Sequence, residues 1–234
     1  MKGIYEGKAK ILYETKDPRF LIMHFKDDAT AFNGKKFAII KRKGRLNKEA
    51  TTIAFDWLEK AGVATHFIRE VSEDEVLVRK VEIIPVEVVV RNVIAGSLAK
   101  RMGLKKGEKL KFPIVEFYYK NDELGDPMLN EYHIRVFDIA NKETIEEMKK
   151  IAFRVNDLLR KKFEQAGILL VDFKIEFGKD EEGKLLVADE ITPDGARLWD
   201  MKTGEVLDKD RFRFDLGDLI KGYEKILERI RCVS

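Results

Sequence analysis

Three charged residues alternate with apolar ones between Val171 and Phe177, in the run VDFKIEF. Successive side chains of a β-strand point to opposite faces, so Asp172, Lys174 and Glu176 would share one face. Two carboxylates beside a lysine suit a magnesium–nucleotide site, because Mg²⁺ keeps several waters and takes one or two protein carboxylates plus phosphate oxygens. A solvated antiparallel strand with cross-strand ion pairs has the same pattern, so the alternation alone leaves both interpretations open.

A second pair of carboxylates ends the next apolar run, where Asp189 and Glu190 follow Leu185–Ala188. A hairpin between this run and the preceding strand would bring Asp189 opposite Lys174 or Glu176. The sequence therefore predicts that charged side chains of two neighbouring strands gather at one place.

Strong turn chemistry follows, in Pro193-Asp194-Gly195. Arg197 and Trp199 come next, a side chain suited to phosphate and a large apolar wall. A turn just beyond a charged strand end is a common place for a functional site, but turn chemistry alone does not separate a site from an ordinary loop.

Arg91 lies inside an otherwise apolar run, and an unpaired buried charge is very costly, so this arginine requires a partner. Ser97 is the expected N-cap of a short helix over Leu98–Met102, and backbone N–H groups at a helix start favour anions. Arg91 and Ser97 could thus form a phosphate pocket. The alternative is an ordinary cap beside an ion pair of Arg91 with Glu87 or Asp172.

The N-terminal run Tyr5–Lys10 reads YEGKAK. Gly7 permits a tight turn and a close backbone approach to a ligand, and Lys8 and Lys10 would point to the same face of a resumed strand. This could be a hairpin over ATP phosphates, although neither common phosphate-binding glycine motif is present. A surface hairpin with solvated lysines is the alternative.

These residues must be positioned by two lobes of an α+β fold. Strands are expected over Ile4–Glu14, Arg19–Phe25, Thr65–Val71, Glu75–Ile84, Val86–Ile94, Ile168–Phe177 and Lys184–Glu190. Helices are expected over Lys48–Ala61, Lys142–Ala166 and Leu216–Ile230. Pro85 is the expected hinge, so that residues 1–84 form a β-rich lobe and residues 85–234 an α+β lobe with a cleft between them.

Composition narrows the class of protein. The 234 residues carry 45 Lys and Arg against 42 Asp and Glu, a net charge of +3, without the basic excess typical of nucleic-acid binders. No apolar run reaches membrane-spanning length, and no signal peptide is evident. Cys232 stands alone, which suits a reducing cytoplasm. The scattered histidines show no metal-ligand spacing and are expected to be structural: His24, His66 and His133.

Seven blocks in order give the sequence a resemblance to the SAICAR synthetase (phosphoribosylaminoimidazole-succinocarboxamide synthase) family. They are Tyr5–Lys10 (YEGKAK), Asp28–Gly34 (DATAFNG), Pro85–Arg101 (PVEVVVRNVIAGSLAKR), Lys120–Asp122 (KND), Asp126–Glu131 (DPMLNE), Val171–Gly178 (VDFKIEFG) and Asp189–Asp200 (DEITPDGARLWD). The resemblance implies an ATP-grasp-like fold with the nucleotide between two lobes. It also implies a ligase that joins L-aspartate to carboxyaminoimidazole ribonucleotide (CAIR) with ATP and Mg²⁺, through an acyl phosphate.

The resemblance also implies roles by position. The nucleotide would contact Lys8, Lys10, Lys120, Glu176 and Asp189, of which Glu176 and Asp189 would hold Mg²⁺. CAIR would contact Glu87, Arg91, Ser97, Asp194 and Arg197, with Arg91, Ser97 and Arg197 on its 5′-phosphate. Asp172 and Lys174 would line the reacting region as the catalytic pair. Many members of the family have Asp where Asn33 stands, which leaves a charge role at that position open.

Two other functions fit parts of the sequence. An ATP-dependent kinase would also combine a hairpin over phosphates with acidic metal ligands, but its product would not require aspartate. An RNA-associated protein could use the basic stretch Lys35–Lys48, and its binding would be sensitive to salt and indifferent to ATP. The resemblance favours small-molecule partners (ATP, CAIR and L-aspartate) and allows a homo-oligomer.

Overall fold

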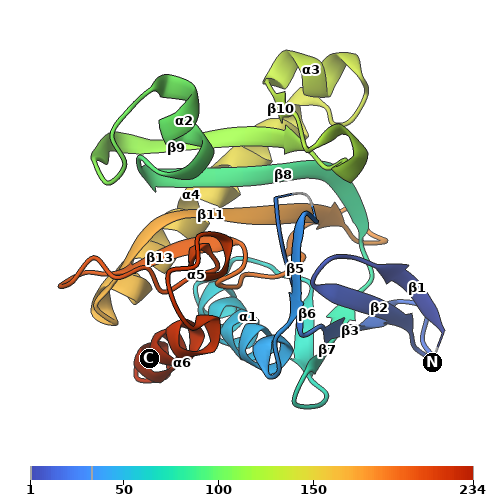
Figure 1. Ribbon diagram of the computed structural model, residues 1–234. Coiled ribbons are helices and arrows are strands. Elements are labelled where there is room, and N and C mark those ends of the chain that lie inside the picture. Colours follow the sequence, from blue (N-terminus) through green and yellow to red (C-terminus); the bar gives the residue numbers. More distant parts are fainter. Residues whose placement is uncertain (1, 33, 234) are drawn as a thin grey trace.

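The computed structural model describes residues 2–32 and 34–233, so Asn33 and any role for it lie outside the described part. The larger of its sheets has the strand order β10-β9-β8-β11-β12, and β13 also pairs with β11 (Figure 1). Its strands are β8 (Glu82–Val93), β9 (Lys109–Tyr119), β10 (Met128–Leu129), β11 (Ile168–Lys179), β12 (Leu185–Ala188) and β13 (Ala196–Asp200). All of these pairings are antiparallel.

A second antiparallel sheet has the order β1-β2-β3-β7-β6. Its strands are β1 (Gly3–Glu6), β2 (Lys10–Glu14), β3 (Phe20–Phe25), β6 (Phe67–Glu70) and β7 (Glu75–Arg79). A separate hairpin is formed by β4 (Asp28–Ala31) and β5 (Lys36–Ile39). The expected break of the first strand at Gly7 is confirmed, because β1 and β2 flank it.

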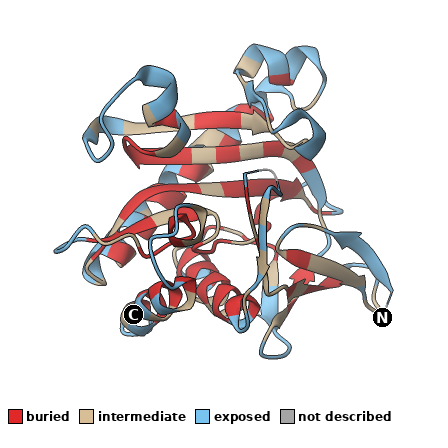
Figure 2. Cartoon of the chain, viewed as in Figure 1, coloured by how far each residue is buried: buried red, intermediate tan, exposed pale blue. Residues whose placement is uncertain are grey.

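The helices cover the sheets and complete the core. They are α1 (Lys43–Lys60), α2 (Gly96–Met102), α3 (Glu131–Val136), α4 (Lys142–Gln165), α5 (Asp210–Arg213) and α6 (Leu219–Ile230), with a 3₁₀ turn, η1, at Asp122–Leu124. Helix α4 packs along β11 and β8, and α1 packs against α6 and α4. Burial concentrates in β8, β11 and the inner faces of α1 and α4, whereas α2 and α3 are largely exposed (Figure 2).

The long helix and the central hairpin confirm the sequence patterns. Helix α4 spans nearly the range expected, and its apolar stripe is buried, including Ile145, Met148 and Leu159. Strand β11 begins at Ile168 as expected. Among the described residues no helix is both long enough and apolar enough to cross a bilayer.

Helix α1 begins at Lys43, five residues before the expected start at Lys48. The signal was missed because the cap comes from a distant strand end: Asp27 accepts hydrogen bonds from the backbone N–H of Gly44 (2.9 Å) and of Arg42 (3.3 Å). Gly44 is also required sterically, since a Cβ there would lie 2.3 Å from the carbonyl oxygen of Phe25. A local cap search cannot find a capping side chain 17 residues away.

Two other expected boundaries are wrong. Pro85 is not a hinge, because it lies within β8, whose Glu82 already pairs with β11; the chain passes between the sheets at residues 80–81. The last helix begins at Leu219 rather than Leu216, because Asp218 accepts hydrogen bonds from Ile220 and Lys221 as its N-cap. Leu216, the expected first residue of this helix, lies outside it and is exposed.

A candidate nucleotide and ribonucleotide cleft

A cleft of about 250 Å³ lies over the face of the larger sheet. Six of its lining residues are ones that the sequence predicted: Glu87, Arg91, Asp172, Lys174, Asp194 and Arg197. Arg213 of α5 also lines it and was not predicted, because nothing in its local sequence marks it. Residues separated by more than 100 positions therefore meet in one place.

The register of β11 explains this convergence. Asp172 lies opposite Arg91 of β8 on one side and Arg197 of β13 on the other. Glu176 lies opposite Glu87 on β8. Because side chains alternate along a strand, one face of β11 carries the whole charged set, as the sequence predicted.

One half of this face is a cluster of carboxylates and lysines. The Nζ atom of Lys174 lies 2.7 Å from Oε1 of Glu176, 3.1 Å from Oε1 of Glu87 and 3.3 Å from Oδ2 of Asp189. Lys120 also contacts Glu176. The expected approach of Asp189 to the Lys174–Glu176 face is confirmed.

The hairpin lysine Lys10 reaches the same cluster from the smaller sheet. It is buried and pairs with both Asp189 and Glu190. Glu190 is a third carboxylate that was noted next to Asp189 but given no role. Lys8 lies apart from this cluster, because its Nζ pairs with Oδ1 of Asp122 in η1 at 2.6 Å and both side chains are exposed.

Backbone conformation aims Asp189 at the cluster. Its φ of 66° lies in the left-handed region that few non-glycine residues adopt. The Nε2 atom of His66 lies 2.9 Å from the Asp189 carbonyl, and since a carbonyl can only accept, the ring donates from Nε2. Burial lowers the pKa of His66 to about 3, so the ring stays neutral. His66 is structural as expected, but it supports a predicted site residue.

The electrostatics of the cluster fix its protonation. Burial opposes charge on Lys174, but the Glu176 and Glu87 carboxylates raise the pKa of Lys174 above its ordinary value. Burial likewise opposes charge on Glu176, but Lys174 and Lys120 hold the pKa of Glu176 well below its usual range. Lys174 is therefore a fixed cation near neutral pH, which suits charge stabilisation and excludes it as a general base.

The residues fit a magnesium ion bound mainly through its nucleotide. The carboxylates of Glu176 and Asp189 both lie within 3.3 Å of the Lys174 ammonium. The two carboxylates therefore point toward the same region, where they could also bind one metal ion. No group of three or more His, Cys, Asp or Glu side chains arranged around a metal position occurs in residues 2–32 and 34–233. Two carboxylates completed by phosphate oxygens and water match the habits of Mg²⁺.

The other half of the charged face is a row of arginines. Arg91 Nη1 donates to Asp172 at 2.8 Å, and Arg197 Nη1 donates to the same carboxylate at 3.0 Å. Arg91 is thus paired with Asp172, one of the two partners expected for it. Arg197 also donates from Nε to Asp210 at 2.9 Å.

Ser97 contacts this row, although not as the cap that was expected. The N-cap of α2 is Ala95, with no capping side chain, and Ser97 lies inside the helix. Its hydroxyl instead accepts a hydrogen bond from Arg91 Nη2 at 2.9 Å. Arg91 and Ser97, suggested as parts of one phosphate pocket, therefore lie in contact, although the expected cap at Ser97 is wrong and the phosphate role stays a prediction.

Asp194 lines the cleft, but its carboxylate is taken up by a buried network. It pairs with Lys43 at 2.5 Å, accepts from Asn47 Nδ2 at 3.0 Å and contacts the Tyr223 hydroxyl. No sequence pattern indicated these partners, which come from α1 and α6. A role of Asp194 toward the ribonucleotide stays a prediction.

The buried carboxylate of Asp208 lies near Arg197 of the arginine row and should make stability depend on pH. Its carboxylate accepts from the backbone N–H of Leu198 (2.7 Å) and of Asp210 (2.8 Å). Burial and the neighbouring Asp210 charge raise the pKa of Asp208 to about 7. The carboxyl group of an unfolded Asp has a pKa of about 3.9. Between that pH and about pH 7, the folded state keeps a proton that the unfolded state has lost, so the free energy of unfolding falls as pH rises.

We therefore expect Asp208 to lower the free energy of unfolding as pH rises from about 4 to about 7, and Asp208→Asn to flatten that fall. Denaturant unfolding at several pH values measures both slopes. An unchanged slope in the variant would show that another group controls the pH dependence.

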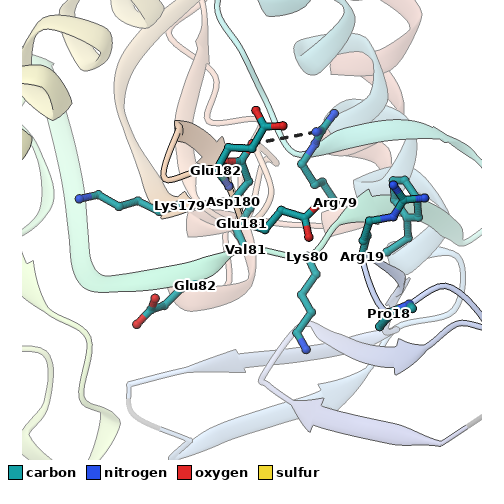
Figure 3. Close-up of a pocket in the computed structure, with 11 residues that line it drawn as sticks. Pro18, Arg19, Arg79, Lys80, Val81, Glu82, Lys179, Asp180, Glu181 and Glu182 are labelled. Atoms are coloured by element: carbon teal, nitrogen blue, oxygen red, sulfur yellow. Dashed lines mark hydrogen bonds and ion pairs between the residues drawn. The ribbon is translucent and has the colours of Figure 1, made fainter.

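A larger cavity, about 580 Å³, lies elsewhere, at the junction of the two sheets (Figure 3). Arg79 approaches Asp180 there at 4.0 Å, and Arg19 and Lys80 lie nearby. None of the predicted site residues lines this cavity. Size alone therefore does not locate the chemistry of this fold.

Comparisons with known proteins agree with the fold. The family model described as SAICAR synthetase matches residues 3–230. A phosphoribosylaminoimidazole-succinocarboxamide synthase of Anoxybacillus flavithermus is 56% identical over 231 residues, covering 99% of this chain and 96% of that protein. The crystal structure of the Ehrlichia chaffeensis synthase matches with a TM-score of 0.97 at 47% identity over 100% of both chains. A SAICAR synthetase solved in complex with ADP matches with a TM-score of 0.95 at 52% identity, over 98% of this chain and 97% of that one.

The fold is of the ATP-grasp-like class and carries an acid–lysine cluster beside an arginine row. The chain belongs to the SAICAR synthetase family, a family of ATP-dependent ligases of purine biosynthesis. The predicted fold class, family and enzyme class are thereby confirmed.

Proposed function

We propose that this chain joins L-aspartate to the carboxylate of CAIR, consuming ATP and releasing ADP, phosphate and SAICAR. The observation that carries the proposal is the division of the charged face of β11. Glu176 and Lys174 belong to a cluster suited to a nucleotide, and Asp172 belongs to a row of arginines suited to a ribonucleotide phosphate. The two substrates would therefore meet above one strand.

ATP would lie between a lobe built on the smaller sheet and a lobe built on the larger sheet, with the boundary at residues 80–81 instead of between the predicted ranges 1–84 and 85–234. Lys10 from the smaller sheet and Lys120 from the larger one both contact the carboxylate cluster, and this supports a nucleotide held from both sides. Lys8 and Asp122 bridge the same two parts of the chain at the surface. Lys8 would meet the phosphates after exchanging its contact with Asp122.

Glu176 and Asp189 would hold Mg²⁺, which when bound offsets negative charge on the transferring phosphoryl group. Lys174 would add a fixed positive charge, and its contact with Glu87 keeps it at the border between nucleotide and ribonucleotide. Preorganised charges of this kind, together with positioning, supply most of the catalysis in phosphoryl transfer.

CAIR would bind along the arginine row with its 5′-phosphate at Arg91, Ser97 and Arg197. Asp172 bridges both arginines and keeps their guanidinium groups in place, so its catalytic role is to position them beside Lys174. Arginine suits this task because its planar donors match phosphate oxygens in pairs.

The chemistry balances without a protein nucleophile. A carboxylate oxygen of CAIR attacks the γ-phosphorus of ATP, the bond to the β-phosphate oxygen breaks, and ADP leaves. The amine of aspartate then attacks the acyl carbon, phosphate leaves with the bonding electron pair, and the nitrogen loses a proton. Lys174 would supply positive charge beside the transferring phosphoryl group.

Product analysis tests this function. The protein is incubated with ATP, Mg²⁺, CAIR and L-aspartate, and the succinylated product is sought by mass. Succinylated product that forms only with aspartate would support the ligase, whereas phosphorylated CAIR that accumulates over many turnovers as the final product, with or without aspartate, would indicate a kinase. RNA binding that falls with salt and ignores ATP would favour the third alternative.

We also propose a cytoplasmic location and small-molecule partners for the reaction. Cys232 is free and exposed, which supports a reducing compartment, the cytoplasm. The partners are the small molecules named above, and assembly into a homo-oligomer remains a prediction that sedimentation can test.

The two hairpin lysines should differ in their effect on the nucleotide. We expect Lys10→Ala and Lys8→Ala both to weaken ATP affinity, Lys10→Ala more strongly, because Lys10 is buried in the acidic cluster and Lys8 is exposed. Affinity for CAIR should hardly change. Calorimetry with ATP and with CAIR measures both affinities, and Lys16→Ala, in the turn between β2 and β3, is a control for loss of a surface charge. If both variants bound ATP as tightly as the wild type, the alternative of a hairpin whose lysines do not contact the nucleotide would be correct.

A further inference from the structure

We propose that Arg101 is a further phosphate-binding residue of the ribonucleotide site, and that the buried carboxylate of Glu116 positions it together with Arg91. The inference rests on the proposed function, because it concerns the 5′-phosphate of the same substrate. Neither Arg101 nor Glu116 was singled out by the sequence patterns.

Two guanidinium groups converge on one hydroxyl. The Ser97 hydroxyl accepts from Arg91 Nη2 at 2.9 Å and from Arg101 Nη1 at 3.3 Å. The Tyr118 hydroxyl accepts from the same two side chains, at 3.2 Å and 2.7 Å. Arg101 therefore shares with Arg91 the serine that the proposed phosphate site already uses.

Glu116 holds both arginines through different oxygens. Its Oε2 accepts from Arg91 Nε at 2.6 Å and from the Tyr118 hydroxyl at 2.8 Å, and its Oε1 accepts from Arg101 Nη2. Glu116 itself is buried on β9, one strand from Arg91. A buried carboxylate between two arginines fixes the direction in which their remaining N–H groups point.

Arg197 closes the group from the other side. A Cβ on Gly96 would lie 2.6 Å from the Arg197 guanidinium, so that guanidinium packs directly on the backbone next to Ser97. Gly96 also has a φ of 52°. Arg91, Arg101 and Arg197 thus all approach the Gly96–Ser97 backbone.

Charge and exposure assign Arg101 its part. Four arginines face three carboxylates, so the group keeps a net charge of +1 for a phosphate dianion: Arg91, Arg101, Arg197 and Arg213 against Glu116, Asp172 and Asp210. The Arg101 side chain is 33% exposed and that of Arg91 is 4% exposed. Arg101 is therefore the more accessible of the two guanidinium groups that bind Ser97.

The test separates the phosphate from the rest of the ligand. Binding of CAIR and of the matching nucleoside without its 5′-phosphate is measured for wild type, Arg101→Met and Glu116→Gln, with Lys100→Met as a control that removes a neighbouring charge of α2. We expect Arg101→Met to weaken CAIR binding about tenfold or more, as for loss of charged hydrogen bonds, and to leave nucleoside binding unchanged. Glu116→Gln should act in the same direction, and Lys100→Met should change neither ligand much.

ATP affinity, measured in parallel, reports whether each variant is folded. Arg101 is partly exposed, so Arg101→Met keeps the test valid if Glu116→Gln fails to fold. Equal weakening of CAIR and nucleoside, or unchanged CAIR binding, would overturn this inference alone. Failure of the wild-type protein to bind CAIR would overturn the proposed function and this inference with it.

Discussion

Glu176→Gln and Asp189→Asn should each lose turnover by about two orders of magnitude or more, comparable to removal of a preorganised charge-stabilising group. ATP brings several negative charges toward these carboxylates, which is tolerable only if cations lie between them. Without one carboxylate the cation loses a ligand and the phosphoryl group is misplaced. Asparagine tolerates the left-handed backbone of Asp189, so that variant should keep the local geometry.

Stability must be measured beside turnover, because Glu176 also has a structural role. Its ion pairs with Lys174 and Lys120 lower its pKa, so its contribution is present above the pKa of an unfolded glutamate and is lost as pH falls below it. Glu176→Gln should therefore lower the melting temperature. Its turnover should be measured at a temperature well below the melting temperature of the variant.

The Mg²⁺ dependence distinguishes a metal ligand from a merely structural carboxylate. Both variants should need more Mg²⁺ to reach half of their own maximal rate, whereas Glu131→Gln, which breaks an exposed pair with Lys149, should not. Near-normal turnover of both cleft variants at saturating Mg²⁺ would show that the metal assignment is wrong, whatever their melting temperatures.

Patterns that repeat within one element could be predicted from the sequence. The alternation along β11 depends only on strand geometry, so the shared face of Asp172, Lys174 and Glu176 followed directly. The buried apolar stripe of α4 could be predicted in the same way, because it depends only on the helical spacing of residues within one segment. The glycine hairpin pointed to Lys10 and the family resemblance supplied Lys120, but the approach of both lysines to this face depends on tertiary structure.

Features that depend on distant partners were missed. The start of α1 depends on Asp27, and the orientation of Arg91 and Arg101 depends on Glu116 of β9. Ser97 looked like a cap because it precedes an apolar turn, yet its hydroxyl binds arginine side chains instead. One-dimensional patterns carry no information about which side chain crosses from a neighbouring strand, so these contacts required the structure.

Asp194→Ala should destabilise the fold by about 3–5 kcal/mol, the range for removing one partner of a buried ion pair. The Lys43 side chain is fully buried, and its Nζ lies 2.5 Å from Asp194. The variant would leave Lys43 charged and unpaired, and Tyr223 would lose its contact with the carboxylate. Denaturant unfolding measures the change, and Asp215→Asn, which removes the charge of an exposed pair with Lys36 and tolerates the left-handed backbone at that position, should have little effect.

A second substitution separates folding from binding at Asp194. Adding Lys43→Met to Asp194→Ala removes the stranded charge, so much of the lost stability should return. If the double variant is stable but binds CAIR poorly, Asp194 also serves the ribonucleotide; if it binds CAIR like wild type, the carboxylate is structural only. Unchanged unfolding of Asp194→Ala itself would contradict the buried pair, because a charged Lys43 without a partner cannot be cheap to bury.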